Sequence, residues 1–340
     1  MRFIENQPLD RLNTFGITAR ARFYAAPESE VELARFLRSV TARNLPLMVL
    51  GGGSNLIFSG DFPGVVLQPA LTGVACIGES ADHYLVEAAG GEKWHDFVQY
   101  TLACHWYGLE NLSLIPGTVG ASPIQNIGAY GVEIADHLHS LTAMEIASGE
   151  VREFSREECR LGYRESVFKQ ELRGRYIITR VRFLLLKAAA VRTGYGDIRQ
   201  ELADHGIVQP TPRQVADAVI AIRTRKLPLP SVLGNAGSFF KNPVVAAGKL
   251  ESLRQHFPEI VAYPQGEQAK LAAGWLIEKA GWKGRRIGPV GSYNKQALVL
   301  VNHGGATGAD VMQVAHAIQQ AVLQMFGVQL EMEPQVYGPD

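Results

Sequence analysis

The chain has 340 residues, of which 46% are hydrophobic and 19% charged, with 33 basic and 33 acidic side chains. This length suffices for two or three domains with cores of their own. The zero formal net charge gives no bulk electrostatic reason to expect a nucleic acid or an anionic membrane as partner. No stretch approaches the roughly 18 apolar residues of a membrane span, and the N-terminal residues contain no apolar signal core.

The first 65 residues predict a small α/β unit. Ser29 and Glu32 form a capping box before apolar residues at helical spacing, which predicts a helix over 29–44. Residues 47–50 indicate a short buried strand that ends at the triple glycine 51–53. The strand would therefore deliver a glycine turn to one edge of this unit.

The next region mixes helix and strand. Apolar residues from Trp94 to His105 mark an amphipathic helix that Gly108 can end. Residues 141–154 predict a hairpin around Ser148-Gly149, and residues 176–186 alternate as a strand. Three cysteines, at positions 76, 104 and 159, form neither a zinc-type spacing nor a disulfide framework, so we expect a reducing, cytoplasmic setting.

The C-terminal third is expected to be another mixed region. Thr211-Pro212 begins a helix that Pro228 stops, and this helix is the candidate domain boundary. Two further helices are predicted over 270–280 and 309–326, the second with a capping residue at its start and a glycine after its end. A final strand is predicted over 328–333.

Two glycine-rich blocks suggest a phosphate-binding cradle. In the first, residues 51–55, successive glycines permit positive φ and point several N–H groups into one concavity that suits an anion. It is no Walker A loop, because no Lys-Ser/Thr follows, and taken alone it is better explained as a tight turn. The second block, 115–131, interleaves glycines with apolar residues and neutral donors, which indicates an ordered loop. Its alternative explanation is an irregular connection between domains.

Two later blocks supply chemistry. Arg164 can hold a carboxylate with two parallel hydrogen bonds, although an Arg beside a Glu is more often a surface ion pair. Ser238 lies between small residues and aromatics and can be half-buried, but no nucleophile elbow surrounds it. Glu331 and Glu333 fall on one face of the last predicted strand. The histidines show no metal-ligand spacing, so we expect no metal site.

These blocks together resemble the UDP-N-acetylenolpyruvoylglucosamine reductase family, flavoproteins of bacterial peptidoglycan precursor synthesis. The resemblance spans nearly the whole chain and rests on residues 12–17, 50–55, 115–131, 162–169, 226–228, 234–243, 270–277 and 296–301. The stretch 234–243 is the most specific of them, and a loop at Tyr195-Gly-Asp197 resembles the longer of the two family types.

The resemblance implies an α+β fold. Its FAD-binding unit would be of the vanillyl-alcohol-oxidase (PCMH) type and made of two subdomains, followed by a C-terminal α+β substrate-binding domain. The implied boundaries are 1–68 for the first subdomain, with the tail 328–340 near it, 69–210 for the second, and 211–327 for the C-terminal domain.

The implied activity is the NADPH-dependent reduction of an enolpyruvyl group by a flavoenzyme. Its substrate would be UDP-N-acetyl-3-O-(1-carboxyvinyl)-glucosamine, and its product UDP-N-acetylmuramate, used in cell wall synthesis. FAD would transfer the hydride after NADPH has reduced it. The UDP-sugar would be the partner, with neither nucleic acid nor membrane involved, and we expect a monomer in the cytoplasm.

The resemblance assigns roles to residues at matching positions. For catalysis these are Arg164 at the substrate carboxylate, Glu333 as acidic partner, and Ser238 as proton donor. The FAD-binding residues would be Gly51, Gly52, Gly53, Ser54, Asn55, Pro116, Gly117, Gly120, Ser122, Gln125, Asn126 and Gly128. The substrate-binding residues would be Tyr163, Tyr195, Lys226, Asn242, Tyr263, Lys270 and Gln296.

One departure from the family pattern lies in the tail, and two alternatives stay open. Family members often end Leu-Glu-Pro-Glu-Val-Arg, whereas this chain has Pro334 and Gln335 in place of Val and Arg. A basic contact is therefore missing there. The first alternative is a flavin oxidase or dehydrogenase of the same fold with another substrate. The second is a nucleotide-sugar-binding protein without catalysis, which only the changed tail favours.

Overall fold

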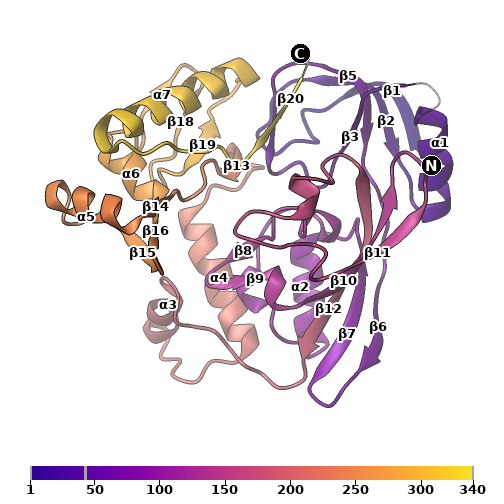
Figure 1. The fold of residues 1–340 in the computed structure, drawn as a ribbon, viewed down its shortest axis with the longest axis horizontal. Helices are drawn as coiled ribbons and strands as arrows, with labels where there is room; N and C mark the ends of the chain where they lie inside the picture. The colour runs from indigo at the N-terminus through magenta and orange to yellow at the C-terminus, as the bar shows by residue number, and fades with distance from the viewer. Residues whose placement is uncertain (1, 42–43, 339–340) are drawn as a thin grey trace. The chain divides into compact units, whose positions relative to one another are not determined.

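The structure is a computed structural model that describes residues 2–41 and 44–338, and the chain forms two compact units (Figure 1). The described residues of unit 1 fall within 1–7, 21–52 and 63–225, and those of unit 2 within 8–20, 53–62 and 226–340. The finer three-part division of the chain stays a prediction. Among the described helices, none combines the length and apolar character that a bilayer crossing requires.

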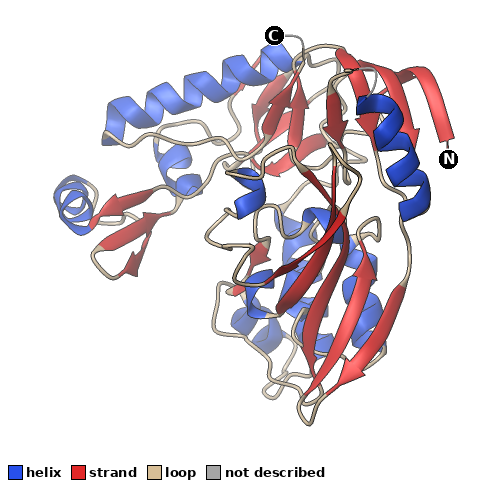
Figure 2. Ribbon diagram, turned by 45° about the vertical axis from the view of Figure 1, so that its right-hand side comes forward, coloured by secondary structure: helices blue, strands red, loops and turns tan. Residues whose placement is uncertain are grey.

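Unit 1 contains a four-stranded sheet with one helix packed on it (Figure 2). The strand order is β1-β2-β5-β3, with β1 Arg2–Pro8, β2 Arg20–Ala26, β3 Leu47–Val49, β5 Phe62–Leu67 and α1 Glu30–Thr41. Leu33 and Leu37 of α1 share a core with Val65 of β5. The Ser29 Oγ accepts the Glu32 N–H at 3.2 Å, as the capping box predicts. The predicted helix and strand are thus confirmed, although the predicted helix end includes residues 42–43, which lie outside the described residues.

A five-stranded antiparallel sheet forms the second layer of unit 1. Its order is β11-β10-β12-β7-β6, with β6 Val74–Glu79, β7 His83–Ala89, β10 Leu138–Glu145, β11 Val151–Ser155 and β12 Tyr176–Leu186. Helix α2, Trp94–Ala103, packs against it because Trp94 and Phe97 meet Phe183 with ring centroids 6.0 and 5.3 Å apart. The predicted amphipathic helix, hairpin and strand are confirmed here. The helix ends at Ala103, well before Gly108.

The remaining elements of unit 1 form loops around these layers and a small helical cluster. They are η1 Glu110–Leu112, η2 Val119–Ala121, β8 Gly128–Ala129, β9 Val132–Glu133, η3 Ile134–Asp136, η4 Val167–Lys169, α3 Ile198–Asp204 and α4 Pro212–Lys226. Val215, Val219 and Ile222 of α4 pack against Ile198 and Leu202 of α3. The predicted helix at Thr211-Pro212 is therefore confirmed.

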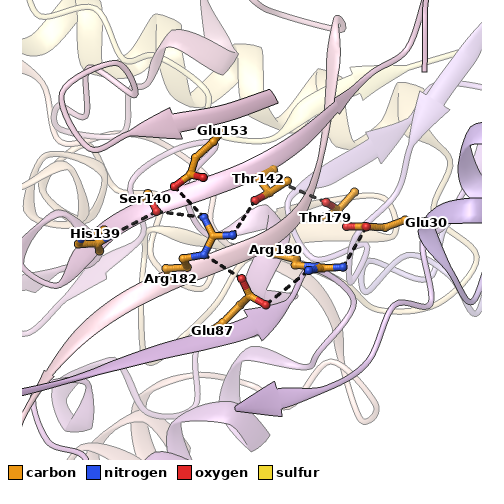
Figure 3. A network of polar contacts seen from close by, with 9 residues as sticks. All are labelled: Glu30, Glu87, His139, Ser140, Thr142, Glu153, Thr179, Arg180 and Arg182. Atoms are coloured by element: carbon orange, nitrogen blue, oxygen red, sulfur yellow. Dashed lines mark hydrogen bonds and ion pairs between the residues drawn. The ribbon is translucent and has the colours of Figure 1, made fainter. Parts of the chain in front are cut away.

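The outward face of β12 is held by a network around Arg182 (Figure 3). Its Nε lies 2.8 Å from Glu87 on β7, and its Nη1 lies 2.8 Å from Glu153 on β11. Its remaining donors reach the hydroxyls of Ser140 at 3.3 Å and Thr142 at 3.2 Å on β10. One guanidinium thus ties four adjacent strands, with only 16% of its side chain exposed.

Replacing Arg182 with methionine is expected to lower the free energy of unfolding by about 2 kcal/mol, because a half-buried carboxylate loses its strongest partner. Urea unfolding followed by circular dichroism measures this change. The matched control is Arg160→Met, whose ion pair with Glu171 is more than 60% exposed on both sides and should contribute little. Equal losses in the two variants would show that the network does not stabilise the sheet.

Unit 2 is built from small sheets and three helices. Its strands are β4 Leu56–Phe58, β13 Gly234–Ser238, β14 Val244–Ala246, β15 Ala262–Gln265, β16 Gln268–Leu271, β17 Arg286–Ile287, β18 Val290–Ser292, β19 Val299–Asn302 and β20 Gln335–Tyr337. They form the orders β13-β19-β18-β17, β14-β16-β15 and β20-β4. The helices are α5 Ala247–His256, α6 Ala273–Lys279 and α7 Gly308–Phe326. The Thr307–Asp310 capping box and the left-handed Gly327 bound α7 as predicted.

The helix predicted over 270–280 is wrong in its first three residues. Lys270 and Leu271 belong to β16, which pairs with β14 and β15 on its two sides. The helix begins only at Ala273, whose N–H donates to the Asn242 Oδ1 at 2.9 Å. A side chain distant in sequence caps the helix, so the local pattern could not place its start.

The strand predicted over 328–333 is also wrong. Only an isolated bridge between Phe240 and Met332 forms there, and the last strand is β20, Gln335–Tyr337. Pro334 lacks an N–H and cannot continue a ladder. After Pro334 the chain pairs instead with β4, in parallel.

Candidate active site

A cavity of about 420 Å³ lies within unit 1, where both glycine-rich blocks meet. The lining residues come from the first sheet, the start of α2 and the two glycine blocks: Tyr24, Ala26, Gly51, Gly52, Gln68, Pro69, Ala70, Gly91, Lys93, His95, Asp96, Ile115, Pro116, Gly117 and Thr118. The strand β3 delivers Gly51 and Gly52 to this point, as the sequence predicts. The two blocks are therefore walls of one cavity.

The glycines are required because the two backbones approach closely. A Cβ added to Gly52 would lie 2.7 Å from the Cα of Gly117, and one added to Gly51 would lie 3.0 Å from the Thr118 Oγ1. Within the described residues, the N–H groups of Gly51, Gly52, Gly117 and Thr118 donate to no other protein group. Four uncommitted backbone donors beside one cavity suit a phosphate or diphosphate.

Five polar residues of the cavity wall were missed by the sequence reasoning: Tyr24, Gln68, Lys93, His95 and Asp96. Two signals could have pointed to them. Gln68 directly follows a buried strand, and His95 and Asp96 lie off the apolar stripe of α2. The His95 Nδ1 accepts the Leu114 N–H at 2.9 Å, and burial lowers the pKa of this imidazole. A neutral ring then carries its proton on Nε2, as a donor.

Other predicted cofactor residues are not among those that line the cavity. Gly53 packs so tightly that an added Cβ would lie 1.9 Å from the Leu12 carbonyl oxygen in unit 2, which also contains Ser54 and Asn55. Gly120 and Ser122 are held by internal bonds, with the Ser122 Oγ donating to the Val119 carbonyl at 2.7 Å.

Asn126 is likewise committed to the protein. Its Nδ2 donates to Glu133 at 2.7 Å and to the Gly162 carbonyl at 3.0 Å, and its Oδ1 accepts the Ala135 N–H at 3.1 Å. Gln125 is half-buried nearby. Direct contacts of these residues with a cofactor stay predictions.

The block 162–169 is pinned to the second glycine block. Asn126 reaches Gly162, and the Ser166 Oγ donates to the Ile124 carbonyl at 2.6 Å. Gly162 and Glu165 exchange backbone hydrogen bonds of 3.0 and 3.2 Å, so residues 163–164 form the tip of a tight turn. Arg164 has a φ of +57°, a conformation that a non-glycine residue adopts only when the surroundings impose it.

The side chain of Arg164 lies along the same loop. Its Nη2 donates to the Gly128 carbonyl at 3.1 Å, and its guanidinium carbon lies 5.4 Å from the ring centre of Tyr163. Gly131 lies close to Tyr195, since an added Cβ on this glycine would lie 3.2 Å from the Cβ of Tyr195. In unit 1, Arg164, Tyr163 and Tyr195 therefore all lie near the 128–131 loop. The family resemblance assigns all three to the substrate.

Ser238 ends β13 in unit 2, where it pairs with Val299. It is exposed, not half-buried, because Gly237 with a φ of +69° and a register shift turn this end of the strand outward. In the described part of the chain, the Ser238 hydroxyl donates to no protein group. The N-terminal segment fixes this strand: the Thr14 Oγ1 donates to the Asn235 carbonyl at 2.7 Å.

The two tail glutamates lie in different surroundings. The Glu333 N–H donates to the Phe239 carbonyl at 2.9 Å, so its backbone lies beside the residue that follows Ser238. Glu331 is 71% exposed, and its carboxylate pairs with Lys241. The Glu333 backbone therefore lies one residue from Ser238 along β13's continuation, whereas the Glu331 carboxylate is exposed and bonds Lys241.

The substrate residues predicted in unit 2 gather near the turn from β16 into α6. Asn242 caps α6, and Gly274 of that helix would place an added Cβ 3.0 Å from the Gln296 Oε1. Tyr263 pairs with Lys270 across β15 and β16. The last of the set, Lys226, ends α4. No group of three or more His, Cys, Asp or Glu that could hold a metal occurs in the described residues.

Comparison with known proteins identifies the family. The C-terminal domain model of UDP-N-acetylenolpyruvoylglucosamine reductase matches residues 228–337, and an FAD binding domain model matches residues 21–155. The chain is 54% identical to the UDP-N-acetylenolpyruvoylglucosamine reductase of Pseudomonas aeruginosa over 334 residues, which cover 98% of each protein. The chain belongs to the UDP-N-acetylenolpyruvoylglucosamine reductase family. The reductase of Chromobacterium violaceum is 51% identical, again over 98% of each protein.

A solved structure supports the same assignment. The crystal structure of UDP-N-acetylenolpyruvylglucosamine reductase from Thermus caldophilus superposes with a TM-score of 0.67 at 25% identity, covering 99% of this chain and 98% of that one. The expected family and fold class, an FAD-binding unit followed by a C-terminal α+β domain, are thus confirmed. Unit 1 contains the whole segment that matches the FAD binding domain except residues 53–62.

The cavity of unit 1 fits the cofactor of this reductase family. FAD has a diphosphate, and the glycine cradle offers four backbone donors without a side chain in the way. Gly52→Ala is expected to weaken FAD binding at least tenfold, because the new methyl group collides with the Gly117 backbone, which cannot move aside as a side chain can.

Fluorescence titration of the apoprotein with FAD measures this effect. The control is Gly248→Ala on α5, where an added Cβ meets nothing within 4 Å. If Gly52→Ala bound FAD with unchanged affinity, the glycine cradle would not be part of the cofactor site.

Proposed function

We propose that this chain is an FAD-dependent oxidoreductase that uses NADPH to reduce the enolpyruvyl group of the UDP-N-acetylglucosamine enolpyruvyl ether. The product is the lactyl ether, UDP-N-acetylmuramate, a precursor of peptidoglycan. The observation that carries the proposal is 54% identity to a named reductase over 98% of both chains. The glycine cradle of unit 1 supports it independently, because it suits a diphosphate cofactor.

The residues that would hold FAD are those of the cavity wall. Gly51, Gly52 and Gly117 offer backbone N–H groups to the diphosphate, and neutral His95 offers an Nε2–H. When bound, FAD supplies a redox centre that takes a hydride from NADPH and passes it to the substrate.

Arg164 is the residue proposed to hold the substrate carboxylate. Negative charge develops on the carbon beside that carboxylate after hydride has reached the vinyl terminus, and a fixed cation stabilises it. The turn formed by Gly162 and Glu165 fixes the Arg164 backbone, and the Gly128 carbonyl orients its guanidinium. Because of both constraints, the Arg164 side chain needs to move little when negative charge develops on the substrate.

Ser238 and Glu333 are proposed to complete the reduction. The Ser238 hydroxyl would give its proton to the carbanionic carbon, and a weak acid suffices because that acceptor is strongly basic. Glu333, whose backbone bonds to Phe239, would assist as the neighbouring acid. The residues proposed to bind the UDP-sugar are Tyr163, Tyr195, Lys226, Asn242, Tyr263, Lys270 and Gln296. A cytoplasmic monomer is part of the same proposal.

Anaerobic stopped-flow absorbance of the FAD-loaded protein tests the function. NADPH should bleach the visible flavin band, and the enolpyruvyl UDP-sugar should restore it. Bleaching without recovery would assign another substrate to the flavin site. A protein that takes up no FAD would contradict both the cradle and the proposed reaction.

A further inference from the structure

Outside the glycine blocks, Tyr24 and Gln68 form a chain of hydrogen bonds that ends at the first glycine turn. Tyr24 lies on β2 and is buried, and its hydroxyl donates to the Gln68 Oε1 at 2.7 Å. The Gln68 Nε2 donates to the Gly51 carbonyl at 2.8 Å. Because the Gly51 carbonyl can only accept, the NH₂ end of Gln68 must face it, and the amide oxygen is then left to accept the Tyr24 hydroxyl, which holds the side chain in place.

Anchoring the Gly51 carbonyl also fixes the next donor. In a trans peptide the C=O of one residue and the N–H of the next point in opposite directions, and the described residues contain no cis peptide. The Gly52 N–H must therefore point away from Gln68. A peptide between two glycines rotates easily, so without the anchor this donor would sample several directions.

We infer that Tyr24 and Gln68 are positioning residues, a relay that holds the Gly51–Gly52 peptide ready for the diphosphate of FAD. The inference rests on the proposed FAD function and deepens it by adding two residues to the cofactor site. Tyr24 and Gln68 both line the cavity, so the competing explanation is that each side chain binds the cofactor directly. In the relay the contribution of Gln68 depends on Tyr24, whereas two independent contacts with the cofactor would give additive contributions.

A double-mutant cycle on FAD affinity separates these explanations. In fluorescence titrations of apoprotein, Gln68→Leu should weaken FAD binding about tenfold and Tyr24→Phe about threefold, each bond being of ordinary strength. The double variant should bind as weakly as Gln68→Leu alone. Gln68→Glu should match Gln68→Leu, because a carboxylate keeps the tyrosine bond but has no donor for the Gly51 carbonyl.

Phosphorus NMR of the FAD-saturated proteins gives the second readout. The diphosphate resonances should shift in Gln68→Leu and stay unchanged in Gln200→Leu, whose amide donates to the surface residue Asp204. The relay would be overturned if the losses of FAD affinity in the two single variants were additive, or if Tyr24→Phe bound FAD as tightly as the wild type. Weaker FAD binding in Gln68→Leu with unshifted diphosphate resonances would also overturn it. If the wild-type protein itself bound no FAD, the failure would belong to the proposed function.

Discussion

Replacing Ser238 with alanine is expected to leave reduction of the bound flavin by NADPH intact and to slow its reoxidation by the enolpyruvyl substrate by about 10²–10⁴-fold. The loss falls in one half-reaction because only the substrate receives a proton from the serine. In the described residues the Ser238 hydroxyl has no protein acceptor, so the substitution removes no internal hydrogen bond. The variant should therefore fold normally, and stopped-flow absorbance of each half-reaction measures the effect.

The control for this variant is Ser252→Ala, at an exposed serine on α5 of the same unit. Both half-reactions should keep their wild-type rates in that protein. Equal slowing of flavin reduction and reoxidation in Ser238→Ala would place the serine outside the proton-transfer step. Slowing of reduction alone would assign it to NADPH binding instead.

Elements defined by local physics could be predicted from the sequence. The alternation of residues 176–186 gives β12 because every second side chain is buried. The Thr307–Asp310 box and Gly327 give both ends of α7, since each signal acts within one turn of helix. The same holds for α1 and α4, whose starts depend on residues close in sequence.

Elements defined by distant partners could not be predicted in this way. Lys270 and Leu271 fit a helical pattern, but pairing with β14 and β15 makes them a strand. The register shift and Gly237 that expose Ser238 depend on pairing with β19, which its sequence neighbours do not reveal. Tertiary contacts outweigh local preference in these segments.

The residues of the candidate site also differ in whether a local sequence signal reveals them. The glycine blocks could be found because their composition is unusual, and they do meet at one cavity. Tyr24 has no comparable signal, since only the pairing of β2 with β5 brings it to Gln68, which in turn bonds the glycine turn. The resemblance assigns Asn126 to the cofactor, and in the structure its amide bonds Glu133, Ala135 and Gly162, so a direct contact with FAD stays a prediction.

Replacing Glu333 with glutamine is expected to slow flavin reoxidation by about 10²-fold, the usual loss when a group that stabilises developing charge is removed. The matched variant Glu331→Gln should change this rate less than threefold. Its carboxylate is 71% exposed, and the proposed reaction gives it no role at the reacting atoms. Single-turnover absorbance with NADPH-reduced enzyme measures both.

Measuring Glu333→Gln beside Glu331→Gln also tests how the altered tail aligns with the family pattern. The sequence offers two glutamates, and counting from Leu330 favours Glu333, although Pro334 and Gln335 depart from the family pattern directly after it. The structure favours the same residue, because the Glu333 N–H bonds the carbonyl of Phe239, the residue after Ser238, while Glu331 bonds through its carbonyl to the Lys241 N–H. A larger loss in Glu331→Gln than in Glu333→Gln would reverse the assignment and shift the catalytic acid by two residues.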